Sequence, residues 1–271
     1  MRKFLKIIGV LAAIFIIYVI CAFYGNPISK YLVTHNAEEY LDENYQNTDF
    51  EIGTVNYDFK TGSYYVHVIS PTSEDSSFTI FAGLNGKIGY DSYEDAVVEK
   101  WNTATRINGE YWEVVKSIIE SEEFPYNQHI GFGDIEFASS DMLSDESTPD
   151  YAIKSESLEL DRDYNISEFG AKAGHLTVYI YDETVTAERL GEILIGIREL
   201  FDTAGVNFYV IDCVLEYPRV EGEEPKDDRV EVMGFLYEDI NEDGITARVK
   251  SSDEKAKAYY EAQNAEKLQQ K

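Results

Sequence analysis

Cysteine is scarce in this sequence of 271 residues, which contains only Cys21 and Cys213. Cys21 falls inside a long apolar run near the N-terminus, and Cys213 falls in a predicted strand far along the chain. Two cysteines in such different surroundings are not expected to form a disulfide. A chain of this length can be stabilised by hydrophobic cores alone, and we interpret Cys213 as a small buried hydrophobic residue.

The sequence also contains few basic residues, with 23 lysines and arginines against 51 aspartates and glutamates. Its formal net charge is −28. A surface of that sign repels phosphate backbones, and the sequence offers no basic patch with interleaved aromatic residues. These observations argue against nucleic-acid binding. The acidic balance instead predicts a well-solvated surface that attracts cations or basic partners.

The sequence lacks the motifs of the common enzyme classes. It has no cysteine cluster, no G-x-S-x-G elbow, no phosphate-binding loop and no dinucleotide fingerprint. Its histidines are scattered and form no H-x-x-x-H spacing: His35, His67, His129 and His175. Zinc sites, catalytic triads and nucleotide cofactors therefore have no support in the sequence. We expect a non-enzymatic protein without cofactors.

The clearest positive signal is an apolar run at residues 7–25, IIGVLAAIFIIYVICAFYG. As a helix, these nineteen residues would span roughly 28 Å, close to the hydrocarbon thickness of a bilayer. Three basic residues, Arg2, Lys3 and Lys6, precede the run, and only Lys30 follows closely. This asymmetry predicts a cytoplasmic N-terminus and export of the rest of the chain.

A cleaved signal peptide is the alternative interpretation of this run. The run is longer than the core of a typical signal peptide, and the sequence CAFYG at its end offers no small-x-small cleavage site. We therefore favour an uncleaved signal anchor at residues 1–25, with the folded part of the chain outside the cytoplasmic membrane.

Residues 26–123 have the pattern of a small α+β domain. Asn26-Pro27 is typical of a helix start, and Asn108-Gly109 is expected to weaken the long helix that contains it. The expected elements are a helix at 27–45, strands at 49–59, 64–70, 76–81 and 87–90, and a helix at 92–122.

The central strands of this domain are apolar on both faces. We expect the long helix to pack on the face of Val66. The opposite face carries Tyr65, His67, Ile69 and Phe81. We favour coverage of this face by the first helix, because two amphipathic helices need two surfaces. If the face is open instead, these four residues are candidate contacts for a protein or peptide partner.

Residues 124–250 predict a second α+β domain, and residues 251–271 predict a polar helical tail. A regular apolar stripe runs from Leu190 to Phe201 and stops at Ala204-Gly205. The expected elements are strands at 129–138, 174–182, 206–217 and 229–237, an exposed loop at 139–150, a helix at 186–203 and an acidic loop at 218–228. The predicted fold class is α+β, with antiparallel sheets packed by amphipathic helices.

Several segments resemble the YfjL-like family of small membrane-anchored bacterial proteins, chiefly from Gram-positive organisms. They are the apolar anchor, NAEEYLDENY, FEIGTVNYDFKTGSYYVHVISPTSEDSSFTIF, HLTVYIYDE and VNFYVIDCVLEYP. The resemblance is one of overall pattern and covers most of the chain. It implies this location and architecture. The family is uncharacterised and has no assigned catalytic residues, so the resemblance implies no activity.

The string DINEDGIT matches the first half of a calcium-binding loop. Asp239, Asn241 and Asp243 place oxygen ligands at alternate positions before a turn at Gly244. The second half does not match, because Lys250 stands where a bidentate glutamate is needed. A tight turn without a metal is the alternative. If calcium binds here, we expect weak binding.

Asp212 stands between the apolar residues Val210 and Val214 on one face of a predicted strand. A carboxyl buried there would be a candidate for acid–base chemistry, while an aspartate bonded to a neighbouring backbone is the simpler explanation. Our leading prediction is a single-pass, extracytoplasmic, non-enzymatic binding or accessory module. The runner-up is a cell-wall or peptide hydrolase that uses Asp212 or Glu216.

Overall fold

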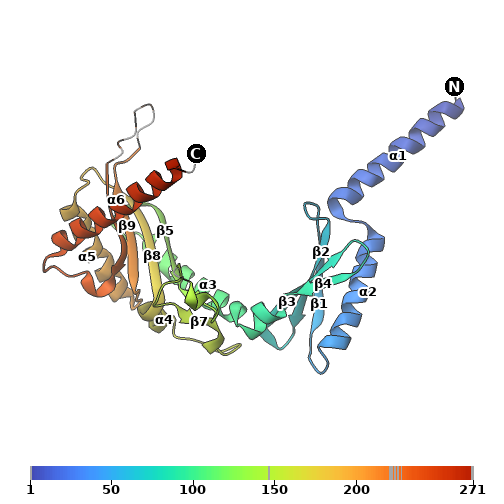
Figure 1. Ribbon diagram of the computed structural model, residues 1–271, viewed down its shortest axis with the longest axis horizontal. Helices are drawn as coiled ribbons and strands as arrows, with labels where there is room; N and C mark the ends of the chain where they lie inside the picture. Colours follow the sequence, from blue (N-terminus) through green and yellow to red (C-terminus); the bar gives the residue numbers. More distant parts are fainter. Residues whose placement is uncertain are drawn as a thin grey trace. The chain divides into compact units, whose positions relative to one another are not determined.

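The computed structural model describes residues 2–145, 147–219, 222, 224, 226 and 228–269 (Figure 1). The chain divides into two compact units, Met1–Thr103 with Leu158–Arg162 and Ala104–Ser157 with Asp163–Lys271. Each unit combines a β-sheet with helices, so the α+β class expected from the sequence is confirmed. The units part inside a helix, between residues 103 and 104, whereas the sequence analysis placed the domain boundary after that helix.

Two helices open the first unit, α1 (Arg2–Tyr24) and α2 (Pro27–Asn44). They are separated at Gly25, whose φ of 74° lies in the left-handed region and interrupts the helical geometry. The Asn26 side chain then caps α2 by accepting a hydrogen bond from the Ser29 N–H at 2.8 Å. The predicted helix start at Asn26 is therefore confirmed.

Helix α1 exposes apolar side chains along its length. Ile16 and Ile20, for example, are 58% and 52% exposed. By length and composition, part of the stretch Phe15–Asn44 is apolar enough to cross a membrane, a test that an N-terminal signal sequence also passes.

The first sheet is an antiparallel meander of order β1-β2-β3-β4. Its strands are β1 (Glu51–Asp58), β2 (Ser63–Ser70), β3 (Ser73–Gly83) and β4 (Ile88–Asp91). One face packs against α2, and together they form a core of Val33, Ala37, Leu41, Tyr64, Val66, Val68, Phe78 and Ile80. The expectation that the helix at 92–122 would cover this face was wrong, because α2 occupies it. From the predicted long helix, Val97 joins this core.

The predicted long helix consists of two segments. A π-helical turn, η1 (Glu94–Val98), precedes α3 (Trp101–Ile119). Lys100 lies between them with a left-handed φ of 65°, which separates the two segments. Helix α3 continues through Asn108 and Gly109, so the weak point predicted there does not break the helix.

The second sheet has the order β10-β9-β8-β5. Its strands are β5 (Asn127–Ile135), β8 (Gly174–Tyr181), β9 (Val210–Glu216) and β10 (Arg229–Leu236). The pairs β10–β9 and β5–β8 are antiparallel. The pair β8–β9 is parallel, because α5 (Ala187–Ala204) carries the chain back to the same end of the sheet. This pair departs from the antiparallel sheets that the sequence predicted.

One face of the second sheet is buried beneath helices. Leu176 and Val178 on β8 are fully buried. On β5, Gly133 brings the backbone close to Val115 of α3, since a Cβ atom at Gly133 would lie 2.8 Å from that side chain. Helix α5 contributes the stripe predicted from the sequence: Leu190, Ile193, Leu194, Ile197 and Phe201. Along β8, the buried side chains alternate with side chains on the opposite face of the sheet, and the latter remain partly exposed.

The remaining elements of the second unit are shorter or were not predicted. They are β6 (Phe137–Ala138) paired in parallel with β7 (Ile153–Lys154), the 3-10 turns η2 (Met142–Ser144), η3 (Ser155–Ser157) and η4 (Tyr237–Asp239), α4 (Ile166–Ala173) and α6 (Ile245–Gln269). Helix α6 begins before the polar tail predicted at 251–271 and contacts β10 and α5. Within the predicted acidic loop, residues 220, 221, 223, 225 and 227 lie outside the described part of the chain.

Candidate functional site

The first sheet brings the four predicted contact residues together on the face opposite α2. We call this surface the aromatic face, made of Tyr65, His67, Ile69, Phe81 and Tyr90. Tyr65 pairs with Phe81 across β2 and β3, and their ring centroids lie 5.2 Å apart in an edge-to-face arrangement. Phe81 in turn stacks on Tyr90 of β4 at 4.4 Å. Tyr90 was not among the predicted contact residues, although an aromatic residue in the short strand predicted at 87–90 was a usable signal.

The aromatic face remains open to solvent within its unit. Tyr90 is 63% exposed, Ile69 is 36% exposed, and His67 is exposed. The Tyr65 hydroxyl donates to Asp58 Oδ2 at 3.2 Å, which holds one ring in place. A pocket of about 310 Å³ adjoins the ring stack and is lined by Thr61, Ser63, Tyr65, Phe81, Ala82, Gly83, Gly89 and Tyr90. The favoured expectation that the first helix would cover this face was therefore wrong.

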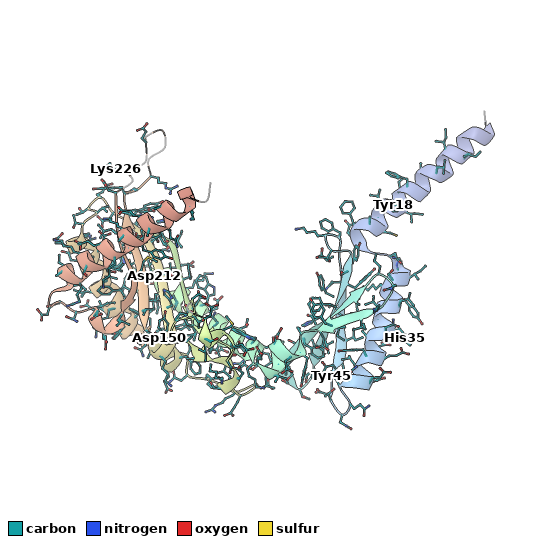
Figure 2. The ribbon with its side chains drawn as sticks, in the orientation of Figure 1. Tyr18, His35, Tyr45, Asp150, Asp212 and Lys226 are labelled. Carbon is teal, nitrogen blue, oxygen red and sulfur yellow. The ribbon has the colours of Figure 1, made fainter. Side chains whose placement is uncertain are left out.

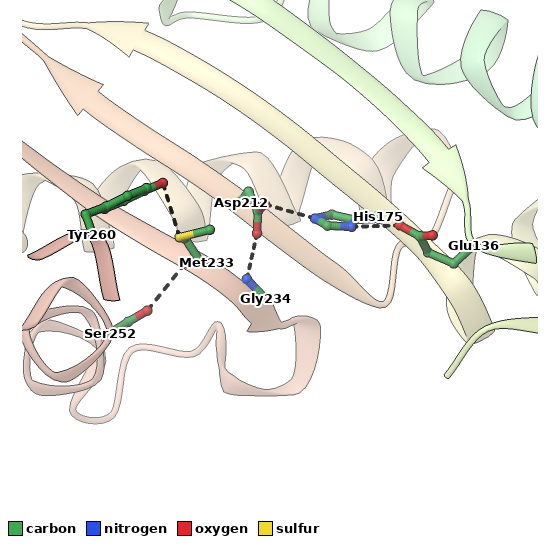
Figure 3. A network of polar contacts seen from close by, with 7 residues as sticks. All are labelled: Glu136, His175, Asp212, Met233, Gly234, Ser252 and Tyr260. Atoms are coloured by element: carbon green, nitrogen blue, oxygen red, sulfur yellow. Dashed lines mark hydrogen bonds and ion pairs between the residues drawn. The ribbon is translucent and has the colours of Figure 1, made fainter. Parts of the chain in front are cut away.

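A second candidate lies on the partly exposed face of the second sheet, where Glu136, His175 and Asp212 form what we call the His175 network (Figure 3). His175 Nδ1 lies 3.1 Å from Glu136 Oε1. His175 Nε2 lies 3.2 Å from Asp212 Oδ2, an ion-pair contact between side chains that are 23% and 25% exposed, in which the Nε2 atom itself is buried and makes no hydrogen bond within the described part of the chain. The other Asp212 oxygen accepts a hydrogen bond from the Gly234 N–H at 2.6 Å.

The electrostatics of this network favour a charged histidine. Burial alone would lower the pKa of His175, but the Asp212 and Glu136 carboxylates outweigh it and raise that pKa to about 9. Burial, followed by the nearby Glu136 charge, raises the pKa of Asp134. At neutral pH, His175 is therefore an imidazolium held between carboxylates, which stabilises the sheet and makes it a poor proton acceptor.

The predicted hydrolase carboxylates do not lie in one site. Asp212 belongs to the His175 network, whereas Glu216 pairs with His129 at 3.1 Å near the other end of β9. His129 also stacks on Tyr181 at 3.9 Å. His35, on the side of α2 that points away from the sheet, pairs with Glu39 at 3.4 Å (Figure 2).

The predicted calcium loop holds an arginine. The Arg248 guanidinium donates to the backbone carbonyls of Asp239, Asn241 and Asp243 at 2.9, 2.9 and 2.5 Å. It also donates to the Asn241 side-chain oxygen at 2.9 Å. Gly244 forms the predicted turn with φ of 72°. Of the predicted ligand oxygens, the Asn241 side-chain oxygen is thus bonded to a built-in cation, which also binds three backbone carbonyls of the loop.

Metal-binding chemistry has no further candidate in the part of the chain that the structure describes. Among those residues, no group of three or more histidine, cysteine, aspartate or glutamate side chains is arranged to hold a metal ion. Cys213 is buried on β9, as expected, and burial raises the pKa of its thiol to about 12.

Two family models match this chain. The YfjL-like N-terminal domain matches residues 1–92, and the YfjL-like C-terminal domain matches residues 110–250. The chain belongs to the YfjL-like family. A search of curated proteins found no match. A crystal structure of a DUF5037 family protein from Ruminococcus gnavus ATCC 29149 is 14% identical, with 76% of this chain and 93% of that chain covered and a TM-score of 0.23.

Proposed function

We propose that this YfjL-like protein is a single-pass membrane protein whose folded units lie outside the cytoplasm and act as a non-enzymatic binding module for a protein or peptide. The observation that carries this proposal is the aromatic face. Its stacked rings are rigid, partly exposed and set on a sheet whose other face is already packed. Such rings provide large contact areas at a small entropic cost, which is why they are enriched in protein interfaces.

The orientation across the membrane is supported by charge. Arg2, Lys3 and Lys6 precede the apolar run, whereas only Lys30 follows it closely. A phosphatase that is active only outside the cytoplasm should be active when fused to the C-terminus. Activity of a cytoplasmic reporter at the same position would contradict the proposed orientation.

The binding role is tested at the aromatic face itself. A photo-crosslinking residue introduced at Tyr65 should capture one defined protein in intact cells. The double change Ile69→Ser and Phe81→Ser should abolish this capture while the melting temperature is retained. Ile130→Ser is the matched control, because Ile130 is 44% exposed in the second unit and lies outside the aromatic face. Undiminished capture by the double variant would overturn the role of this face.

A hydrolase is the second candidate function, and one contact favours it. Asp212 lies 3.2 Å from His175, a pairing of residue types that can move protons. Against it stands the raised pKa of His175, which keeps the imidazole protonated at neutral pH. A turnover screen on cell-wall fragments and peptides separates the two functions. Turnover by the wild type that is lost in Asp212→Asn would establish the hydrolase.

A further inference from the structure

The end of α1 contacts the turn between β1 and β2. Phe23 lies on the last turn of α1, and Phe59 follows directly after β1. Their ring centroids are 5.6 Å apart. Both residues nevertheless remain about half exposed to solvent, with exposed fractions of 56% for Phe23 and 54% for Phe59. An aromatic pair that remains half exposed in this way has apolar surface left to bury.

This contact is held in place by the junction that follows α1. The Tyr64 hydroxyl accepts a hydrogen bond from the Asn26 N–H and donates one to the Asn26 carbonyl, both at 3.1 Å. Gly25 packs so closely on the strands that an added Cβ atom would lie 3.0 Å from Tyr57. The β1–β2 turn is therefore fixed beside the end of α1.

The exposed apolar surface of α1 continues onto this turn. Ile20 is 52% exposed and Tyr24 is 82% exposed on the last turns of the helix, and Phe59 extends that surface on the sheet side. Lys60, the next residue, is exposed. Tyrosine is typical of the boundary between hydrocarbon and headgroups, phenylalanine occurs on the apolar side of interfacial segments, and a neighbouring lysine can reach the phosphates with its ammonium group.

We propose that the tip of the β1–β2 turn, Phe59 with Lys60, is a second membrane contact beside the end of α1. Phe59 inserts into the interfacial layer next to Phe23, and Lys60 contacts lipid phosphates. The occupant of this apolar surface is thus the same bilayer that holds α1. The inference rests on the proposed function, because it requires α1 to span a membrane. It fixes the β1–β2 end of the first sheet at the lipid surface.

Tryptophan quenching in liposomes tests this contact. Full-length Phe59→Trp is reconstituted into phosphatidylcholine and phosphatidylglycerol vesicles whose acyl chains carry bromine close to the headgroup. We expect its added emission, above the wild-type baseline from Trp101 and Trp112, to be quenched as strongly as that of a Phe23→Trp reference. Glu51→Trp is the matched control. Glu51 is exposed at the other end of β1, roughly 23 Å from its last residue, and its added emission should not be quenched.

The outcomes separate this inference from the proposed function. Quenching of the Phe23→Trp reference without quenching of Phe59→Trp would overturn the second contact and leave the anchor intact. Absence of quenching in both would contradict the membrane-spanning role of α1. Circular dichroism verifies the fold of each variant. Lys60→Trp serves as a second probe of the same tip, and it should be quenched even if Phe59→Trp is poorly folded.

Discussion

His175 on β8 and Asp212 on β9 lie 3.2 Å apart, measured between Nε2 and Oδ2. The contact exists because α5 returns the chain so that these strands pair in parallel, with Thr177 opposite Asp212. Glu136 approaches the other ring nitrogen at 3.1 Å. Two carboxylates from distant parts of the sequence therefore share one imidazolium, and the charge state of that ring is linked to the stability of the second unit.

The first prediction concerns the pH dependence of stability. The pKa of His175 is about 9 in the folded chain and near 6.5 when unfolded. Because the folded pKa is the higher one, this stabilisation is complete below about pH 6.5 and is lost as the pH rises through about 9. After allowance for the 23% exposure of the His175 side chain, we expect the free energy of unfolding to fall by roughly 1–2 kcal/mol as the pH rises. Melting curves between these pH values measure it.

His175→Gln should remove most of this pH dependence and lower stability at pH 6. The matched control is His67→Gln, since His67 is exposed on the first sheet and lies outside the network. His67→Gln should show the same change in melting temperature between pH 6.5 and 9 as the wild type. Two outcomes would contradict the stabilising role of the His175 network. One is a wild-type melting temperature that rises between pH 6.5 and 9, and the other is a His175→Gln variant whose melting temperature depends on pH as strongly as that of the wild type.

The sequence predicted the strands that carry this network and the helix that connects them, but not the contacts between the side chains. Helix α5 was recognisable from its apolar stripe and from its stop at Gly205, which adopts a left-handed φ of 69°. His175 and Asp212 were each visible as polar residues in apolar strands. Alternation along a strand gives the face of a side chain but not the neighbouring strand or its direction. Only the parallel pairing of β8 with β9 brings the two together.

The assignment of helices to sheet faces was unpredictable for a similar reason. The first sheet has apolar residues on both faces, and the sequence offered two amphipathic helices to cover them. The choice depends on a local junction, in which Tyr64 bonds the backbone of Asn26 and places α2 against the face of Val66. The left-handed Lys100 then separates α3 from the preceding turn. The conformation of single backbone positions such as these is difficult to predict from a sequence.

The second prediction contrasts two helical glycines of the second unit. Gly109 lies inside α3, and an added Cβ atom meets nothing within 4 Å. Gly109→Ala should therefore stabilise the protein by about 0.5–1 kcal/mol, because alanine loses less backbone entropy in a helix. Gly170 in α4 is packed against the Asn207 carbonyl, and a Cβ atom there would also lie 2.8 Å from Tyr111. Gly170→Ala should destabilise by about 1–3 kcal/mol.

Thermal unfolding of both variants measures this contrast under identical conditions. Equal effects of the two substitutions would show that intrinsic helix propensity, rather than the close contact at Gly170, controls the outcome. A destabilised Gly109→Ala would contradict the open surroundings of Gly109 in α3.

The third prediction concerns Arg248, whose guanidinium bonds backbone carbonyls throughout the loop of Asp239, Asn241 and Asp243. Arg248→Gln should destabilise by about 1–3 kcal/mol, because several carbonyls lose a charged donor. The control is Lys250→Gln. Lys250 contacts Glu188 at 2.8 Å in a pair that is more than half exposed, so its loss should cost less than about 1 kcal/mol.

The same loop predicts that calcium does not stabilise the protein. Since the Arg248 guanidinium places a positive charge against this loop and already bonds Asn241 Oδ1, calcium at millimolar concentration should leave the wild-type melting temperature unchanged relative to magnesium. A rise with calcium but not with magnesium would restore the calcium site predicted from Asp239, Asn241 and Asp243.

The fourth prediction concerns Tyr64, which is 1% exposed and joins the start of α2 to the first sheet. Tyr64→Phe leaves the ring packed but removes the partner of the Asn26 N–H, so the first unit should lose about 1–2 kcal/mol. Tyr65→Phe is the matched control, because the neighbouring hydroxyl bonds Asp58 on the exposed face and its removal should cost less than about 0.5 kcal/mol. Amide hydrogen exchange at the start of α2 should quicken in Tyr64→Phe and stay unchanged in Tyr65→Phe. Equal exchange in the two variants would show that packing alone holds α2 on the sheet.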